Sequence, residues 1–93
     1  MVLVSDIKES IRLAKHYNDG AQHAAEVPDN RAGYVKLNLQ VIVYAEQALA
    51  QIHLAAEVLA VSGLRGMMPA IHALRGEASE LTRVAQQNIV DSL

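Results

Sequence analysis

The segment from Tyr34 to Ser62 runs without a turn signal, and it constrains the fold more than any other part of the chain. Its first residues, "YVKLNLQVIVY", alternate apolar and polar side chains, which is typical of a β-strand. The residues that follow, "AEQALAQIHLAAEVLA", are rich in strong helix formers, and the sequence offers no second strand for pairing. We therefore predict one long helix over residues 33–62.

A first helix is predicted over about residues 6–27. Asp6 and Glu9 have the spacing of a capping box, and Ser5 is the competing N-cap residue. Pro28 begins the turn-forming run "PDNRAG", which ends this helix and reverses the chain. A narrow seam at spacings of four and three residues is expected to face inward: Ile7, Ile11, Ala14, Asn18, Ala21 and Ala25.

A third helix is predicted over residues 69–91, after a break in the chain. Gly63 suits the left-handed position that ends a helix, and Pro69 suits the first turn of the next one. The inward seam predicted for this helix is Ile71, Leu74, Ala78, Leu81, Ala85 and either Asn88 or Ile89.

Together these segments predict an all-α, three-helix up-down bundle in a single domain, residues 1–93. At 1.5 Å per residue the central helix is about 44 Å long, against roughly 32 and 34 Å for its neighbours. Its predicted seam is Val35, Asn38, Ile42, Ala45, Leu49, Ile52, Ala56 and Leu59. Apolar residues also fill the neighbouring stripes, so two shorter helices are expected to leave part of it uncovered.

The uncovered surface predicts a non-catalytic, alanine-rich interaction or assembly protein that forms a coiled-coil-like larger bundle. The proposed interface residues are Val35, Leu39, Ile42, Val43, Leu49 and Ile52, and the sequence leaves open which of them face inward. A homodimer is expected first, since two-fold symmetry lets one apolar face cover its own copy. The competing interpretation is a bundle that exposes a few valines and leucines without function.

Asn18 and Asn38 fall on otherwise apolar seams. A polar residue at such a position fixes the register and number of helices in some bundles. The hydroxyls of Tyr34 and Tyr44 are candidate partners for these amides. The alternative is that both asparagines face water.

Few side chains suggest catalysis or ligand binding. The chain has no cysteine, its serines stand outside any nucleophile elbow, and no glycine-rich loop follows a strand, so no enzyme activity is expected. His16, Asp19 and His23 share a helix face, on which Asp19 and His23 could hold one metal ion, and His53 precedes Glu57 by one turn. Each of these two pairs offers only two ligands, and a structural zinc site needs four. A metal-binding or small-ligand bundle would require His23, His53 and Glu57 to converge. We predict no metal and no cofactor.

Charge and hydropathy limit the partners. The net charge is −2 and no basic block occurs, so nucleic acid is not an expected partner. Glu46, His53 and Glu57 interrupt the most apolar segment, 41–61, which argues against a membrane span. A cytoplasmic protein is expected, and export by a route that needs no signal peptide is left open.

The turn "SGLRG" at 62–66, between two long helices of a mildly acidic chain, resembles the WXG100/ESAT-6-like proteins of type VII secretion. The resemblance implies a helical hairpin, homo- or heterodimers, and export of the folded pair. Leu64 stands where that family has tryptophan, and an additional helix precedes the hairpin. The segment "TRVAQQNIVDSL" lacks the family's Tyr-x-x-x-Asp/Glu export signal, so no functional residue is transferred.

Overall fold

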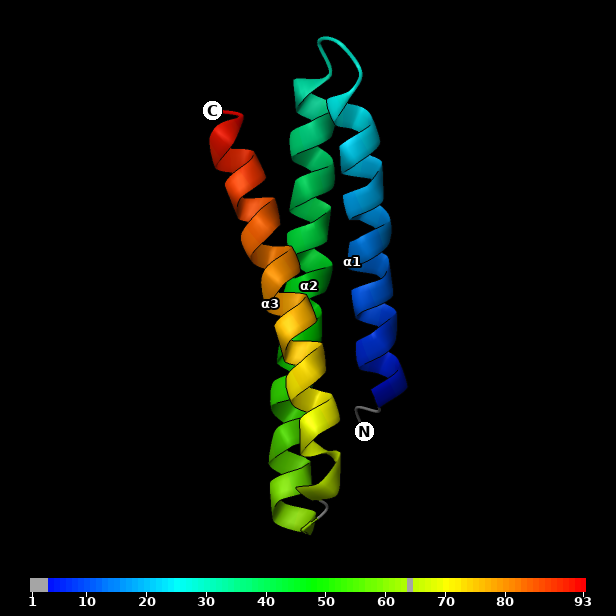
Figure 1. Ribbon diagram of the computed structural model, residues 1–93, viewed down its shortest axis with the longest axis vertical. Helices are drawn as coiled ribbons and strands as arrows, with labels where there is room; N and C mark the ends of the chain where they lie inside the picture. The colour runs from blue at the N-terminus through cyan, green and yellow to red at the C-terminus, as the bar shows by residue number, and fades with distance from the viewer. Residues whose placement is uncertain (1–3, 64) are drawn as a thin grey trace.

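The structure, a computed structural model, describes residues 4–63 and 65–93 and is an antiparallel bundle of three helices (Figure 1). Helix α1 spans Val4–Ala25, α2 spans Arg31–Ser62 and α3 spans Met68–Asp91. A short 3-10 helix, η1, spans Arg65–Met67 and leads into α3. The predicted all-α, up-down bundle is therefore confirmed, and each helix begins one or two residues earlier than expected.

Glycine and proline set the boundary between α2 and α3, as predicted. Gly63 has φ of 77°, in the left-handed region, and its N–H donates to the carbonyl oxygen of Leu59. This bond satisfies one of the carbonyls that the helix end leaves without a partner. Pro69 lies in the first turn of α3, where its missing N–H costs no helical hydrogen bond.

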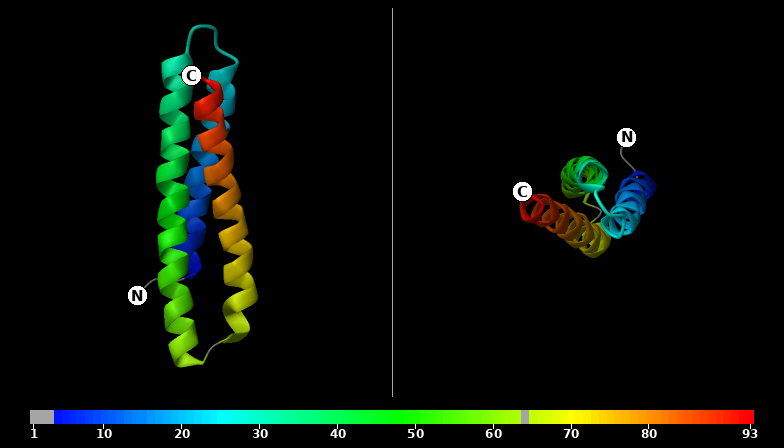
Figure 2. Two further views of the ribbon diagram at one scale, coloured as in Figure 1. Left: turned by 90° about the vertical axis from the view of Figure 1, so that its left-hand side faces the viewer. Right: turned by 90° about the horizontal axis from the view of Figure 1, so that it is seen from above.

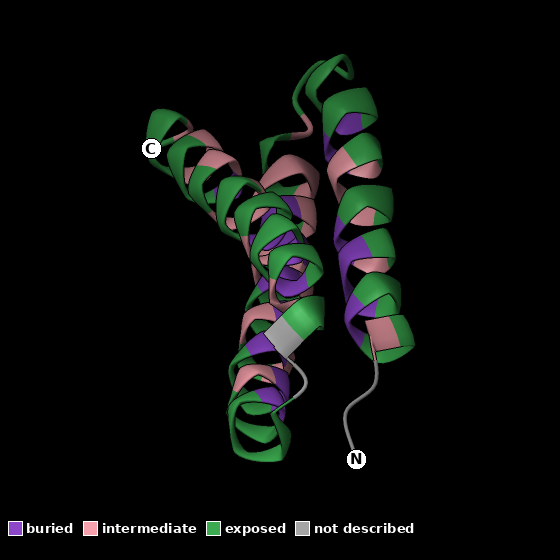
Figure 3. Cartoon of the chain, turned by 60° about the horizontal axis from the view of Figure 1, so that its bottom comes forward, coloured by how far each residue is buried: buried purple, intermediate pink, exposed green. Residues whose placement is uncertain are grey.

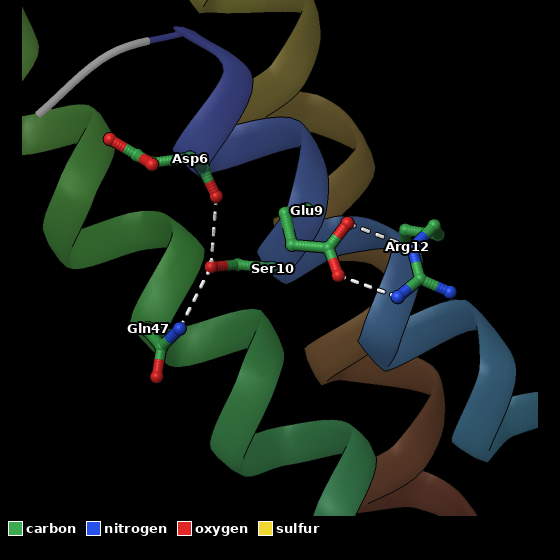
Figure 4. Close-up of polar contacts among 5 residues, drawn as sticks. All are labelled: Asp6, Glu9, Ser10, Arg12 and Gln47. Atoms are coloured by element: carbon green, nitrogen blue, oxygen red, sulfur yellow. Dashed lines mark hydrogen bonds and ion pairs between the residues drawn. The ribbon is translucent and has the colours of Figure 1, made fainter.

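Of the two remaining predictions about helix starts, the capping box is wrong and the helical reading of the segment after Tyr34 is confirmed. Because α1 begins at Val4, Asp6 lies inside the first turn and does not form a capping box; Glu9 pairs with Arg12 instead (Figure 4). An acidic residue in the first turn still complements the helix dipole. The strand-like segment after Tyr34 is helical throughout, so the helix propensity of the following residues outweighs the local alternation.

Helix α2 packs against both of the other helices, and Figure 2 shows the three helices grouped together as a bundle. Helices α1 and α3 touch each other much less, and the C-terminal end of α3 diverges from the bundle (Figure 1). The α2–α3 hairpin also extends past the start of α1. The result is a rod with extents of 52 × 20 × 17 Å.

Alanine lines much of the core. The buried residues of α2 recur at alternating spacings of three and four: Asn38, Val41, Ala45, Ala48, Ile52, Ala55 and Leu59. This is the spacing of a coiled coil, in which one narrow row faces the partner helices. Five more buried alanines come from the other two helices: Ala14, Ala21, Ala24, Ala78 and Ala85. Small side chains on facing rows allow the helix axes to approach closely.

The predicted seam of α2 needs a correction. Val35, Ile42, Leu49 and Ala56 are only partly buried, and the neighbouring row that contains Ala48 takes their place in the core. Apolar residues occupy both rows, so periodicity alone does not separate them. The row with smaller side chains faces inward, where the three helices come closest.

Asn38 is fully buried on the seam, and it is hydrogen-bonded on both sides of its amide. Its Nδ2 donates to the Tyr34 carbonyl oxygen at 2.9 Å, and its Oδ1 accepts from Asn88 Nδ2 at 3.1 Å. Asn88 belongs to α3, so this pair joins two helices. Tyr34 thus contributes its backbone to Asn38, while the ring of Tyr44 stacks on that of Tyr17 with centroids 5.4 Å apart.

Asn18, the second seam asparagine, is half-buried. The sequence reasoning missed a second buried polar residue, Ser10, which is 1% exposed between α1 and α2 (Figure 4). Its hydroxyl oxygen accepts from Gln47 Nε2 at 2.9 Å, and it lies 2.7 Å from Gln51 Oε1 and 3.2 Å from the Asp6 carbonyl oxygen. The hydroxyl group has one proton to donate, and these two oxygens are its acceptors. Ser10 and Asn38 therefore each place a hydrogen-bonded polar layer between α2 and one neighbour.

Enlarging a core alanine tests whether close helix approach holds the bundle together. We expect Ala48→Leu to lower the free energy of unfolding by about 1–3 kcal/mol, because the larger side chain forces the helices apart. The matched control is Ala60→Leu on the exposed side of the same helix, with an expected change within about 0.5 kcal/mol. Urea unfolding followed by circular dichroism measures both, and equal values for the two variants would contradict the alanine core.

Candidate interaction surface

Helix α2 carries most of the large apolar side chains that the bundle leaves exposed. Figure 3 shows exposed positions, in green, along each of the helices. Five of the apolar side chains of α2 are at least half exposed: Leu39, Val43, Leu54, Val58 and Val61. Within each half of the helix they are spaced three or four residues apart, so they form two short apolar stripes. An exposed stripe of this kind differs from single scattered residues, which are ordinary on protein surfaces.

Three of the predicted interface residues are accessible at the start of α2. Leu39 is 50% exposed and Val43 is 54% exposed, while Val35 is partly buried. Val35 and Leu39 line an open hollow of about 660 Å³, together with Ala32, Leu93 and two cationic side chains, Arg31 and Lys36. The surface that lines this hollow is mostly apolar.

The other three predicted residues face the bundle itself. Ile52 is 0% exposed in the main core cluster, so its place on an outer interface is wrong. Leu49 packs against the same cluster, and Ile42 packs against a second cluster around Val41 and Ala45. Ile52 lies on the inward row both in the predicted seam and in the structure, and Ile42 and Leu49 flank that row.

Leu54, Val58 and Val61 are the exposed residues that the sequence reasoning did not place in the interface. Val58 and Val61 line a hollow of about 330 Å³ with Glu57 and Ser62. The surface that lines this hollow is almost wholly apolar, as it is at the other end of α2. Their spacing of four and three residues is typical of one helix face and could have indicated a shared surface. Many other positions of α2 are also apolar, so the sequence did not distinguish this face from the others.

The candidate metal ligands do not come together. His23 lies near the end of α1, whereas His53 and Glu57 lie in the second half of α2, which runs in the opposite direction. His53 Nε2 is 3.2 Å from Glu57 Oε1, and both side chains are mostly exposed. Among residues 4–63 and 65–93, no three histidine, aspartate or glutamate side chains are grouped closely enough to hold a metal ion.

A polar hollow of about 540 Å³ lies between the α1–α2 turn and the end of α3. Two of its lining residues are hydrogen-bonded within the last turns of α3. The Ser92 hydroxyl donates to the Asn88 carbonyl oxygen at 2.8 Å, and the Asp91 carboxylate accepts from the Gln87 side-chain amide at 2.8 Å.

Charged residues elsewhere are joined in exposed ion pairs. Arg12 pairs with Glu9 and Arg83 with Glu80, each three residues apart, and Lys15 reaches Glu77 across the α1–α3 boundary at 3.0 Å. The guanidinium hydrogen bonds lower the pKa of Glu9 and Glu80 below the ordinary value for glutamate. Exposed pairs of this kind contribute little to stability.

None of the helices in the described part of the chain is long and apolar enough to cross a membrane. Comparison with protein-family models, with curated proteins and with solved structures returns no match for this chain. The function of this chain is therefore inferred from its own exposed surface.

Two truncations separate the core from the surface of α2. We expect Ile52→Ala to lower the free energy of unfolding by about 2–5 kcal/mol, because it leaves a cavity among buried side chains. Val61→Ala, at a position 90% exposed, is expected to change it by less than about 0.5 kcal/mol. Thermal or urea unfolding measures both, and an Ile52→Ala variant as stable as Val61→Ala would show that Ile52 is not a core residue.

The Glu9–Arg12 pair gives a prediction about pH. Because the folded pKa of Glu9 is lowered, its small stabilising contribution is present above the unfolded pKa and is lost as pH falls through the folded value. We expect Arg12→Met to return the Glu9 pKa to its ordinary value. An NMR pH titration of the Glu9 carboxyl group checks this, with Glu80, which Arg83 holds at a lowered pKa, as a control that the variant leaves unchanged. An unchanged Glu9 titration in the variant would contradict the pairing.

Proposed function

We propose that this chain is a non-catalytic helical assembly protein that works by association through the exposed side of α2, with a second copy of itself as the first expected partner. The observation that carries the proposal is the exposure of Leu39, Val43, Leu54 and Val58 on the longest helix, each at 50% or more. Removing such a side chain from water contributes about 1.5–3 kcal/mol when its burial is complete. Several of them on one helix supply a driving force for association.

Charge and chemistry support binding to protein in preference to other partners. The basic side chains of Arg12, Lys15 and Arg83 are engaged with carboxylates, which weakens any phosphate-binding surface. The outer side of α2 contains both signs of charge among apolar residues, as protein interfaces do. A chain without cysteine also suits a reducing compartment such as the cytoplasm.

The similarity to WXG100/ESAT-6-like proteins stays a prediction. The antiparallel α2–α3 hairpin, with its turn at Gly63, is the part of the structure that supports it. Since no known relative bears on the resemblance, export of this chain is not part of the proposal.

Light scattering tests the proposal directly. We expect the wild-type chain to have about twice its monomer mass of 10.1 kDa, and the double variant Leu39→Ser/Val43→Ser to move toward the monomer with unchanged helicity. Val90→Ser is the matched control, because Val90 is an exposed apolar residue of α3 outside the proposed surface. A substitution at Ile42 is unsuitable here, since Ile42 also packs on the core.

A wild-type chain that stays at 10.1 kDa as its concentration rises to the millimolar range would contradict self-association. Loss of the dimer in Val90→Ser, with no effect of Leu39→Ser/Val43→Ser, would place the association on another face.

A further inference from the structure

We infer that the occupant of the exposed side of α2 is α2 of a second copy, lying antiparallel across a two-fold axis near Glu46 and Gln47. The inference rests on the proposed function and adds the orientation and register of the two helices. It depends on which residues lie farthest from the core of the bundle, and on the order of charge along them.

Lys36, Val43, Ala50 and Glu57 recur every seven residues along α2, so they lie on one line of the helix. Val43 is two residues from both Val41 and Ala45, which face the core, and two residues correspond to about 200° around the helix. The line therefore runs along the side opposite the buried row. All four residues are exposed, with 54% for Val43 and 64% for the Glu57 side chain.

The charges of α2 are separated along its length. Arg31 and Lys36 lie in its first turns, and its acidic residues, Glu46 and Glu57, lie in the middle and near the end. A parallel second copy would place Lys36 beside Lys36 and Glu57 beside Glu57. An antiparallel copy places each Lys36 beside Glu57 of the partner subunit, and the helix dipoles also favour this orientation.

The apolar residues of the line are complementary in the same register. The arrangement that pairs position 36 with position 57 also pairs position 43 with position 50, because each pair sums to 93. Val43 then faces the small Ala50 of the partner subunit twice, which permits a close approach of the two helix axes. Leu39 and Leu54 lie on either side of the line and widen the apolar contact.

The register has one identifiable cost. It brings the two copies of Glu46 close to the two-fold axis, where their carboxylates repel each other. We therefore expect Glu46→Gln to tighten the dimer, with a dissociation constant lower by about threefold or more. An interface elsewhere on the bundle predicts no change for this variant.

Charge reversal tests the orientation. In one chain Lys36 and Glu57 are separated by 21 residues, which is about 32 Å along α2, so they do not interact within a monomer. We expect Lys36→Glu or Glu57→Lys alone to raise the dissociation constant of the dimer about tenfold, because two attractive pairs become repulsive. The double variant Lys36→Glu/Glu57→Lys is expected to restore it. Single variants that dimerise as well as the wild type would overturn the antiparallel pairing.

Disulfide trapping tests the register, and the absence of native cysteine makes it specific. Val43→Cys and Ala50→Cys are prepared as separate proteins, each helical and folded by circular dichroism. Positions 43 and 50 of one helix are about 10 Å apart along its axis, too far for an internal disulfide. We expect the mixed proteins to give the crossed 43–50 disulfide dimer under mild oxidation, and each protein alone to give little. Efficient self-linking of Val43→Cys would overturn the inference.

The two failures are distinguishable. A wild-type dimer by light scattering, combined with no crossed disulfide and no rescue by the double charge variant, overturns the antiparallel inference and leaves association through another arrangement. A wild-type monomer at all concentrations overturns this inference together with self-association.

Discussion

The close packing of alanines along α2 is the constraint on which the rest of the structure depends. Ala45, Ala48 and Ala55 bring the neighbouring helices near to α2, so the row that faces inward is narrow. A narrow core has no space for the leucines and valines of the adjacent rows. Those larger side chains are consequently half-buried at the edge of the core or exposed on the outer side, and the exposed surface of α2 is a direct result of its small-residue interior.

Alanine rows also leave a problem of register, because one alanine fits against another in several alignments. The polar layers at Ser10 and Asn38 reduce that freedom. A shift of α3 by one turn along α2 would separate Asn38 from Asn88. A similar shift of α1 would separate Ser10 from Gln47. Either shift would leave buried polar groups without hydrogen-bond partners. A buried polar group that loses its hydrogen bond costs about 1–3 kcal/mol. The two polar layers thus select one register between neighbouring helices, which small apolar side chains alone do not.

The sequence was sufficient for the fold because its boundaries have strong local causes. Gly63 and Pro69 mark the α2–α3 turn by backbone conformation alone, and the inward rows of α1 and α3 alternate clearly with polar residues. The face of α2 was less predictable, since both of its central rows are apolar and their difference is one of size. Ile42 and Leu49 were placed on the inward row for that reason, and Ser10 was missed because its burial depends on Gln47 and Gln51 of another helix.

The same physical cause connects the fold to the proposed function. A three-helix bundle with a wider core would draw Leu39 and Val43 inward and leave α2 a polar outer side. Here the length of α2 and the narrowness of its core leave a line of residues opposite the buried row, with a cation at one end, an anion at the other and apolar side chains between them. Such a line is complementary in charge to the same line of a second copy that runs in the opposite direction. Because binding to the folded state stabilises it by an amount that grows with the logarithm of ligand concentration, a self-complementary face would also make the stability of this small bundle rise with its concentration.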